Sequence, residues 1–240
     1  MILLLKKIAS KIFNMGGYRK DKVDALRKKG AKIGKGVMLY SEDIFIDEGR
    51  PWLLEIGEYT KITHQCIILT HDYSLSVLRR VYGEWIGEGQ VTHIGKNCFI
   101  GMGSIILMGT HIGDNVIVGA GSVVHGTIPD NVLVAGNPAK VICTLDEHYN
   151  KRKQQTKEEA LTCANAFYSS IGREPKPADL SGFKFLFTPR NKETVAEYGL
   201  NFQCTGDEPL EVEDAFYRSE PVWASYKEFL KDAKKKREKD

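Results

Sequence analysis

Histidine is the side chain best suited to general acid–base catalysis near neutral pH, so the six histidines of this 240-residue chain are its leading candidates for a catalytic base. His71 stands in the stretch ILTHDYS, residues 68–74, where a six-residue pattern in the sequence stops. The pattern resumes at Ile94, after residues 73–93. This interruption singles out His71, because an inserted segment beside it can form a wall against which a substrate is held.

The other histidines are weaker candidates. His93 comes immediately before the pattern resumes and is expected to provide a second polar contact to substrate. Surface or interface positions are expected for His64, His111 and His125.

A carboxylate could orient the imidazole of His71. Asp72 is one candidate, but adjacent residues rarely face each other. A carboxylate from another part of the fold is an equal candidate, and Glu55 is one such residue.

The element that must position His71 is a repeat of six residues. From Ile94 the sequence divides into IGKNCF, IGMGSI, ILMGTH, IGDNVI, VGAGSV and VHGTIP, each beginning with Ile or Val. The second residue is Gly in four of the six, and the fifth is small or β-branched throughout. Earlier hexads begin at Ile33, Leu39, Ile56, Ile62 and Ile68. The phase is lost across residues 45–55 and again between 74 and 93.

A period of six fits neither an amphipathic helix nor a strand that alternates every two residues. It fits a coil with flat faces, in which each hexad supplies one short strand and one turn. The branched first residue points inward and stacks on its equivalent one coil away, and the small fifth residue fills the space beside it. Glycine at the second position tolerates a tight corner, where φ can be positive. Three such faces make a triangular prism, so the sequence predicts a parallel β-helix.

These hexads resemble those of the hexapeptide-repeat acyltransferases, particularly the sugar and polysaccharide O-acetyltransferases. The resemblance covers residues 33–143 and includes the closing segment IPDNVLVAGNPAKVI, residues 128–142. It implies a left-handed coil, against the usual right-handed rule for parallel crossovers. It also implies a homotrimer whose active sites form between subunits.

The resemblance implies that His71 is the catalytic base. Transfer of an acetyl group from acetyl-CoA to a sugar hydroxyl requires a base that takes the hydroxyl proton as the oxygen attacks the thioester directly. A backbone N–H of a neighbouring coil could stabilise the resulting oxyanion. Asp72, Trp85 and His93 are expected to contact the acceptor.

For the acetyl-CoA donor, the resemblance implies contacts along a groove between two subunits. The matching positions in this sequence are Gly101, Met102, Gly119, Ala120 and Lys140, the last meeting the nucleotide phosphates. Two residues depart from the family pattern: Phe99 stands where Trp is frequent, and Cys143 stands where a second basic residue is expected. Neither GMGS nor GAGS completes a dinucleotide-binding fingerprint.

The cysteines and the composition exclude several classes of protein. The five cysteines lack the spacing of a zinc site or of a disulfide framework, so no metal is expected. Cys66 and Cys98 occupy the inward fifth position, where cysteine behaves as a small hydrophobic residue rather than a nucleophile. With 42% hydrophobic and 27% charged residues, the chain is expected to be a soluble, cytoplasmic protein.

The N-terminal stretch MILLLKKIASKIF has apolar residues at helical spacing with lysines between them. It predicts a basic amphipathic helix that packs on the body or lies on an anionic membrane surface, so peripheral membrane contact is an open alternative. The stretch has neither the length of a membrane-spanning helix nor the order of a secretory signal. The net charge of +3 and the lack of a recognition motif argue against nucleic-acid binding.

We therefore expect three regions: an N-terminal helical segment, residues 1–32, the β-helix with its insertion, residues 33–143, and a C-terminal extension, residues 144–240. The fold class is mainly β, and the extension is expected to be α/β but mostly helical. Helices are predicted over residues 145–170, 190–200 and 221–236, with a short strand at FKFLF, residues 183–187.

The function predicted from the sequence is acetyl-CoA-dependent O-acetylation of a sugar, the expected acceptor being a unit of a surface polysaccharide or its precursor. N-acetylation of an amino sugar or an antibiotic is an alternative, because the same base and thioester would suffice. A structural or binding β-helix is the non-enzyme alternative, since a repeat by itself does not imply catalysis.

Overall fold

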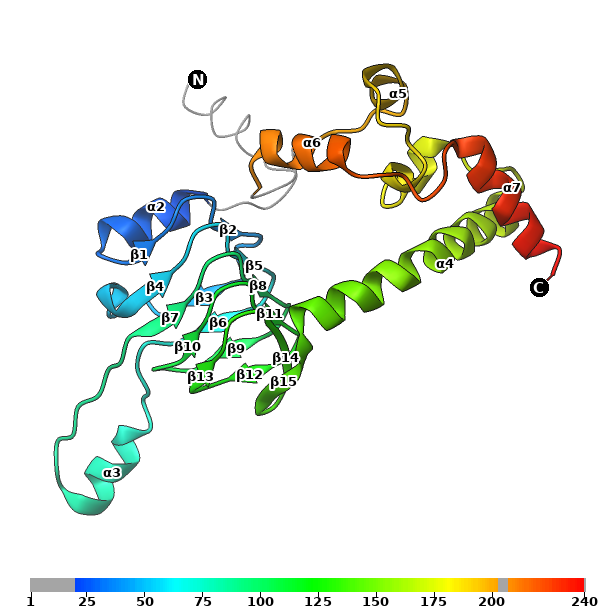
Figure 1. Ribbon diagram of the computed structural model, residues 1–240. Helices are drawn as coiled ribbons and strands as arrows, with labels where there is room; N and C mark the ends of the chain where they lie inside the picture. Colours follow the sequence, from blue (N-terminus) through cyan, green and yellow to red (C-terminus); the bar gives the residue numbers. More distant parts are fainter. Residues whose placement is uncertain (1–19, 203–206, 240) are drawn as a thin grey trace, which may run out of the picture. The chain divides into compact units, whose positions relative to one another are not determined.

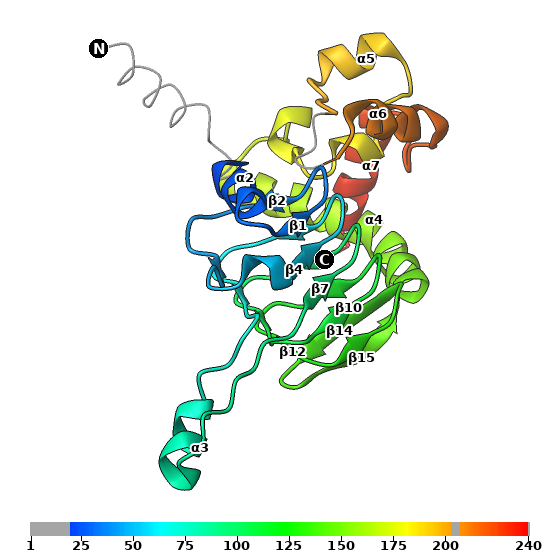
Figure 2. The same ribbon diagram turned by 90° about the vertical axis from the view of Figure 1, so that its left-hand side faces the viewer.

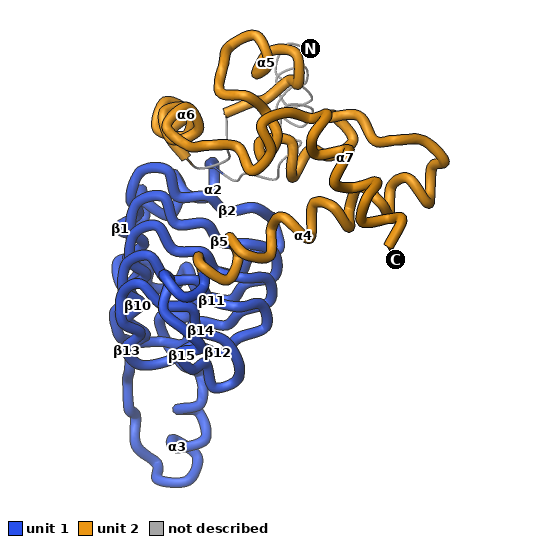
Figure 3. Tube along the Cα trace, turned by 45° about the vertical axis from the view of Figure 1, so that its right-hand side comes forward, with its two compact units in different colours: residues 1–148 blue, residues 149–240 orange. Residues whose placement is uncertain are grey.

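The computed structural model describes residues 20–202 and 207–239, and the chain divides into two compact units, residues 1–148 and 149–240 (Figure 3). The amphipathic helix predicted for the first thirteen residues lies outside the described residues. None of the helices in the described part of the chain combines the length and the hydropathy that crossing a membrane requires.

The first unit is a three-sided coil in which successive strands pass from one face to the next (Figure 1). Face A contains β1 (Lys32–Ile33), β4 (Leu54–Ile56), β7 (Thr92–Ile94), β10 (His111–Ile112) and β13 (Thr127–Ile128). Face B contains β2 (Met38–Leu39), β5 (Lys61–Ile62), β8 (Phe99–Ile100), β11 (Ile117–Val118), β14 (Val132–Gly136) and β15 (Ala139–Thr144). Face C contains β3 (Phe45–Ile46), β6 (Ile67–Ile68), β9 (Ile105–Ile106) and β12 (Val123–Val124).

Every pair of neighbouring strands in these faces is parallel except β14 and β15, which form an antiparallel pair at the end of the coil. The predicted parallel coil is therefore confirmed. Its three-faced arrangement fits the left-handed β-helix that the resemblance implies.

The core of the coil consists of the first and fifth residues of the hexads. On face A, for example, Ile56, Ile94 and Ile112 lie in register and are buried. Burying one such side chain stabilises the fold by about 1.5–3 kcal/mol. The fifth positions are filled by small buried side chains: Thr60, Cys66, Cys98, Ser104, Thr110, Val116 and Ser122.

The glycines at the second position of the hexads have a role that differs from the predicted one. A Cβ on Gly95 would lie 2.3 Å from the carbonyl oxygen of Gly113 in the next coil, so the close approach of coils requires glycine there. Positive φ falls instead at the fourth position, as at Asn97 (51°) and Gly103 (69°). At these corners the second residue of the hexad is closely packed against the next coil, whereas the fourth residue adopts the left-handed backbone conformation.

The first break in the phase of the repeat, residues 45–55, begins with a complete strand of the coil, β3. β3 pairs with β6 in register, Phe45 with Ile67 and Ile46 with Ile68. Ile46 follows Leu39 by seven positions, one more than the repeat predicts. The loss of phase across residues 45–55 thus has a simple cause: one inserted residue shifts the phase while the coil continues, and the 3-10 helix η1 (Pro51–Leu53) then leads to face A.

The second phase break is a projecting loop. It leaves the prism after β6, contains the helix α3 (Leu75–Tyr82) and returns to β7 at Thr92 (Figures 1 and 2). The last two residues of the predicted insertion, 92–93, therefore belong to face A. At the N-terminal end of the coil, helix α2 (Lys20–Lys28) buries Val23 and Leu26 in the core of the coil.

The second unit is helical in its described part. Its elements are α4 (Leu145–Ile171, beginning just before the unit boundary), η2 (Pro177–Leu180), η3 (Lys184–Leu186), α5 (Lys192–Glu197), α6 (Pro209–Arg218) and α7 (Tyr226–Arg237). The helices predicted over residues 145–170, 190–200 and 221–236 are confirmed. No helix is predicted for the residues that form α6.

The short strand predicted at FKFLF, and with it the α/β character of the extension, is wrong for the residues that the structure describes. Lys184–Leu186 form a 3-10 helix. The next residue, Phe187, is fully buried and stacks on Phe229 of α7 with ring centroids 4.7 Å apart. Aromatic packing against a helix, rather than strand pairing, therefore decides the conformation of this segment.

Candidate active site

His71 lies just beyond β6, at the edge where face C meets face A and the loop leaves the prism. Its partner comes from the preceding coil. β3 lies beside β6 with Ile46 opposite Ile68, so the residue after β3, Asp47, reaches the residues that follow β6. The imidazole Nδ1 of His71 is hydrogen-bonded to Oδ2 of Asp47. Of the two alternatives, Asp72 or a carboxylate from another coil, the structure has the second. The residue is Asp47 and not Glu55, which lies beside His93.

Asp47 is buried and fully engaged. The Thr70 hydroxyl and backbone N–H donate to Oδ2 at 2.6 and 3.2 Å, and the Gly49 N–H donates to Oδ1 at 3.0 Å. Burial raises the pKa of Asp47, but the hydrogen bonds from Thr70, Gly49 and His71 outweigh it, and the net pKa is lowered. Asp47 is therefore an anion near neutral pH.

An ionised Asp47 determines which nitrogen of His71 holds the proton. A carboxylate can only accept, so Nδ1 carries the hydrogen and donates it. In the described part of the chain the imidazole has no other hydrogen-bond partner. The neutral ring thus keeps Nε2 unprotonated, which is the state of a general base.

The loop residues beside His71 make contacts of their own within the chain. The two carboxylate oxygens of Asp72 accept hydrogen bonds from the Ser74 N–H and hydroxyl, both at 2.7 Å, and so form the turn that leads into α3. Trp85 is 85% exposed, with the Arg79 guanidinium 4.4 Å from its ring centroid. The aromatic ring that meets the imidazole belongs to Tyr73, at a centroid distance of 4.3 Å.

His93 belongs to a second cluster, on face A. Its Nδ1 lies 3.2 Å from Oε2 of Glu55, and the Lys32 ammonium donates to Oε1 of Glu55 at 2.6 Å. Hydrogen bonds from Lys32 and His93 lower the pKa of Glu55, and burial raises it. The net pKa of Glu55 is lowered. The His93 ring also stacks on His111, with centroids 4.4 Å apart.

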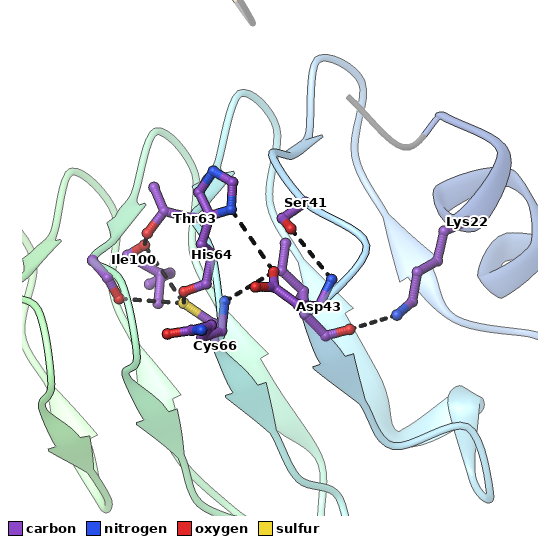
Figure 4. Close-up of polar contacts among 10 residues, drawn as sticks. Lys22, Ser41, Asp43, Thr63, His64, Cys66 and Ile100 are labelled. Atoms are coloured by element: carbon purple, nitrogen blue, oxygen red, sulfur yellow. Dashed lines mark hydrogen bonds and ion pairs between the residues drawn. The ribbon is translucent and has the colours of Figure 1, made fainter. Parts of the chain in front are cut away.

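His64 belongs to a third cluster, at the edge between faces B and C (Figure 4). Its Nδ1 lies 3.8 Å from Oδ1 of Asp43, which also accepts a hydrogen bond from the Gln65 N–H at 3.2 Å. Both side chains of this pair are about half exposed. The cluster is a surface pair of the kind expected for His64.

The cysteines of the coil are poor nucleophiles. Cys66, also in Figure 4, is fully buried with its Sγ 3.2 Å from the carbonyl oxygen of Gly101. Burial raises the pKa of Cys66 and raises that of Cys98 to about 11. Within the described ranges, no group of three or more His, Cys, Asp or Glu side chains is arranged to hold a metal ion.

Four of the five residues expected to bind the donor, Gly101, Met102, Gly119 and Ala120, lie in two stacked turns, after β8 and after β11. The Gly101 N–H donates to the Val118 carbonyl at 2.9 Å, and the Gly121 N–H donates to the Met102 carbonyl at 2.7 Å. A Cβ on Gly101 would lie 2.6 Å from the Val118 oxygen, so this turn requires glycine. Met102 is exposed, as is Lys140 on β15.

These turns and His71 lie at different edges of the prism, with face C between them. The outward row of face C is apolar and consists of Phe45, Ile67, Ile105 and Val123. The outward row of face A is polar and consists of Lys32, Glu55, His93, His111 and Thr127. One chain therefore does not bring the expected donor turns to His71.

Known proteins resemble the coil. A family profile for the hexapeptide repeat of succinyl-transferase matches residues 91–125. Protein CapG of Staphylococcus aureus is 42% identical over 128 residues, 53% of this chain and 74% of CapG. YvoF of Bacillus subtilis strain 168, whose name describes it provisionally as an acetyltransferase, is 32% identical over 129 residues, 54% of this chain and 67% of YvoF.

Solved structures share parts of the chain as well. A maltose O-acetyltransferase from Clostridium difficile 630 is 28% identical, with a TM-score of 0.39, over 59% of this chain and 88% of that one. A serine acetyltransferase from Neisseria gonorrhoeae is 28% identical, with a TM-score of 0.38, over 48% of this chain. The match spans only 38% of the serine acetyltransferase.

Proposed function

Because the chain belongs to the hexapeptide-repeat acetyltransferase family, and is therefore an acyltransferase, we propose that it transfers acetyl groups from acetyl-CoA to a sugar hydroxyl. The acceptor we propose is a unit of a surface polysaccharide or its precursor. The observation that carries the proposal is the hydrogen bond between Asp47 and His71 at the edge where the loop leaves the coil.

The mechanism follows from the state of this pair. Nε2 of His71 takes the proton of the acceptor hydroxyl while the hydroxyl oxygen attacks the thioester carbonyl. The charge of Asp47 stabilises the imidazolium that forms. As the tetrahedral intermediate collapses, the C–S bond breaks, and the imidazolium returns the proton to the departing thiolate of CoA. The new C–O bond is the acetyl ester.

The donor site in this proposal forms between subunits of a homotrimer of left-handed coils. Gly101, Met102, Gly119 and Ala120 would line the pantetheine arm, and Lys140 would meet the nucleotide phosphates. Two observations support the assembly: the donor turns and His71 occupy different edges of one prism, and the face between these edges presents an apolar row. Apolar rows of this kind favour burial against another copy.

Substrate contacts complete the proposal. Asp72, Trp85 and His93 remain proposed acceptor contacts, carried by the loop and by face A. We also propose a cytoplasmic location, with the N-terminal basic stretch as a peripheral membrane contact.

The test is turnover of acetyl-CoA by the purified chain over a panel of sugars and amino sugars, followed by release of free CoA. We expect turnover with a hydroxyl acceptor and a product that gains one acetyl group and loses it in mild base. A base-stable product would indicate N-transfer to an amine. A protein that releases no CoA with any acceptor would instead be a binding β-helix. Light scattering tests the trimer, whose mass should be three times 27.0 kDa.

A further inference from the structure

Tyr73 is an exposed aromatic residue held against the imidazole of His71. The two rings are nearly perpendicular, at 82°, with centroids 4.3 Å apart. Tyr73 is nevertheless 81% exposed, so most of the side chain is left uncovered by the residues that the structure describes. An aromatic side chain in this state offers a free apolar surface directly beside the candidate base.

The position of Tyr73 is fixed from both sides. On one side, His71 is held by its hydrogen bond to Asp47. On the other side, Asp72 holds the turn through its two hydrogen bonds to Ser74. The Tyr73 carbonyl accepts the Ser76 N–H at 3.2 Å, at the start of α3. The ring therefore stands at a defined place at the base of the loop, not at its tip.

This geometry restricts what can bind at His71. Nδ1 is occupied by Asp47, so an acceptor hydroxyl must approach Nε2. The Tyr73 ring stands at 82° to the imidazole plane with its centroid only 4.3 Å from that of the imidazole, so a sugar bound at Nε2 is within reach of the Tyr73 ring. A pyranose ring has one face of C–H groups, and such polarised C–H bonds pack favourably on the π face of an aromatic ring. A small acyclic alcohol presents no comparable face.

We infer that Tyr73 is a positioning residue for the acceptor, and that it selects sugar rings over small acyclic alcohols by packing against their C–H face. The inference rests on the proposed function and specifies the acceptor class of the same site. It assigns the contact to the ring of Tyr73 and not to its hydroxyl. Tyr73→Phe should therefore behave like the wild type, whereas Tyr73→Ala should not.

The experiment compares Tyr73→Ala, Tyr73→Phe and the matched control Tyr82→Ala. Tyr82 is another exposed tyrosine of the loop, 67% exposed, and it makes no ring contact within the described part of the chain. In Tyr73→Ala, KM for the best sugar should rise roughly threefold to tenfold, the range expected for a lost aromatic contact. KM for acetyl-CoA and the pH profile of kcat should not change. The preference for that sugar over glycerol should fall by the same factor.

Tyr73→Phe and Tyr82→Ala should match the wild type in all of these measurements. The inference is overturned if Tyr73→Ala lowers kcat equally for sugars and glycerol, or shifts the pH profile, because Tyr73 would then act on His71 itself. It is also overturned if Tyr82→Ala has the same effect as Tyr73→Ala.

Acceptor binding without acetyl-CoA separates this inference from the proposed function. Saturation-transfer NMR with the same sugars should show ring C–H contacts in the wild type and Tyr73→Phe, and weaker contacts in Tyr73→Ala. Sugar binding that depends on Tyr73, in a protein that releases no CoA, would support the inference and contradict the acetyltransferase. Binding that is absent from the wild type, or equal in Tyr73→Ala, would overturn the inference.

Discussion

The prism carries two close histidine–carboxylate pairs, His71 with Asp47 and His93 with Glu55, whose surroundings differ. The side chain of Asp47 is 5% exposed, and that of Glu55 is 27% exposed. Asp47 receives hydrogen bonds from neutral groups of the chain in addition to His71. Glu55 is shared between His93 and the ammonium of Lys32.

The difference decides what each carboxylate can do for its imidazole. A lysine beside a carboxylate neutralises much of the charge that the imidazole would otherwise feel, so His93 gains less from Glu55. Among the described residues, Asp47 has no lysine or arginine as a hydrogen-bond partner, and its side chain is only 5% exposed, so water screens its charge less than that of Glu55. A buried carboxylate whose other donors are neutral thus favours a catalytic histidine, whereas an exposed carboxylate shared with a lysine favours a surface row.

The largest expected effect is that of His71→Ala. Removal of a general base lowers the rate roughly 10²–10⁴-fold, and we expect kcat for sugar acetylation to fall within this range. The measurement is CoA release at saturating acetyl-CoA. The thermal unfolding midpoint should fall modestly, because the variant removes one hydrogen bond from the buried carboxylate of Asp47, which keeps those from Thr70 and Gly49. Wild-type turnover in His71→Ala would refute the assignment of the base.

The second prediction concerns Asp47→Asn, which keeps the shape of the side chain and removes its charge. Hydrogen bonds to charged groups contribute about 1.5–3 kcal/mol, so loss of the charge that stabilises the imidazolium should lower kcat roughly 10- to 150-fold. The pH profile of kcat, measured for both proteins, should also move. An Asp47→Asn variant with unaltered kcat would mean that the hydrogen bond does not serve the reaction.

The third prediction is a pH dependence of stability. The folded-state pKa of Asp47 lies below its ordinary value of 3.8, so the folded chain favours the ionised form more than the unfolded chain does. The stabilisation is present above pH 3.8 and is lost as the pH falls through the folded-state pKa. Urea unfolding at pH 7, 5, 4 and 3 should show a difference between the wild type and Asp47→Asn that shrinks toward pH 3. A constant difference would contradict the lowered pKa.

The coil was predictable from the sequence because its core repeats at fixed positions, but Asp47 was not. The pairing that brings Asp47 to His71 depends on β3, and one extra residue between Leu39 and Ile46 takes this strand out of phase. The signal was present in the segment IFID, residues 44–47, whose alternate residues Ile44 and Ile46 are both buried. A search that allowed a one-residue shift at a corner would have found the strand.

Other parts of the candidate site depend on the loop and on packing, which the repeat does not encode. The placement of Tyr73 follows from the turn that Asp72 makes with Ser74. The residue types at positions 72 and 74 do not by themselves determine that this hydrogen bond forms. Glu55 was a reasonable partner for His71 by sequence, but its register places it directly beside His93 on face A. The register of the strands sets which residues are cross-strand neighbours. It therefore determines that Asp47, and not Glu55, is the carboxylate beside His71.

The smallest expected effect is that of the face A pair, and it tests the comparison most sharply. Exposed ion pairs contribute about 0.2–1 kcal/mol, so Glu55→Gln and His93→Ala should each change kcat/KM by no more than about fivefold. If His93 contacts the acceptor as proposed, the change should lie in KM for the sugar, with kcat and its pH profile unaltered. A fall in kcat for His93→Ala as large as that for His71→Ala would show that exposure and sharing of the carboxylate do not separate the two pairs. In that case the base would have to be sought on face A, where His93 stacks on His111.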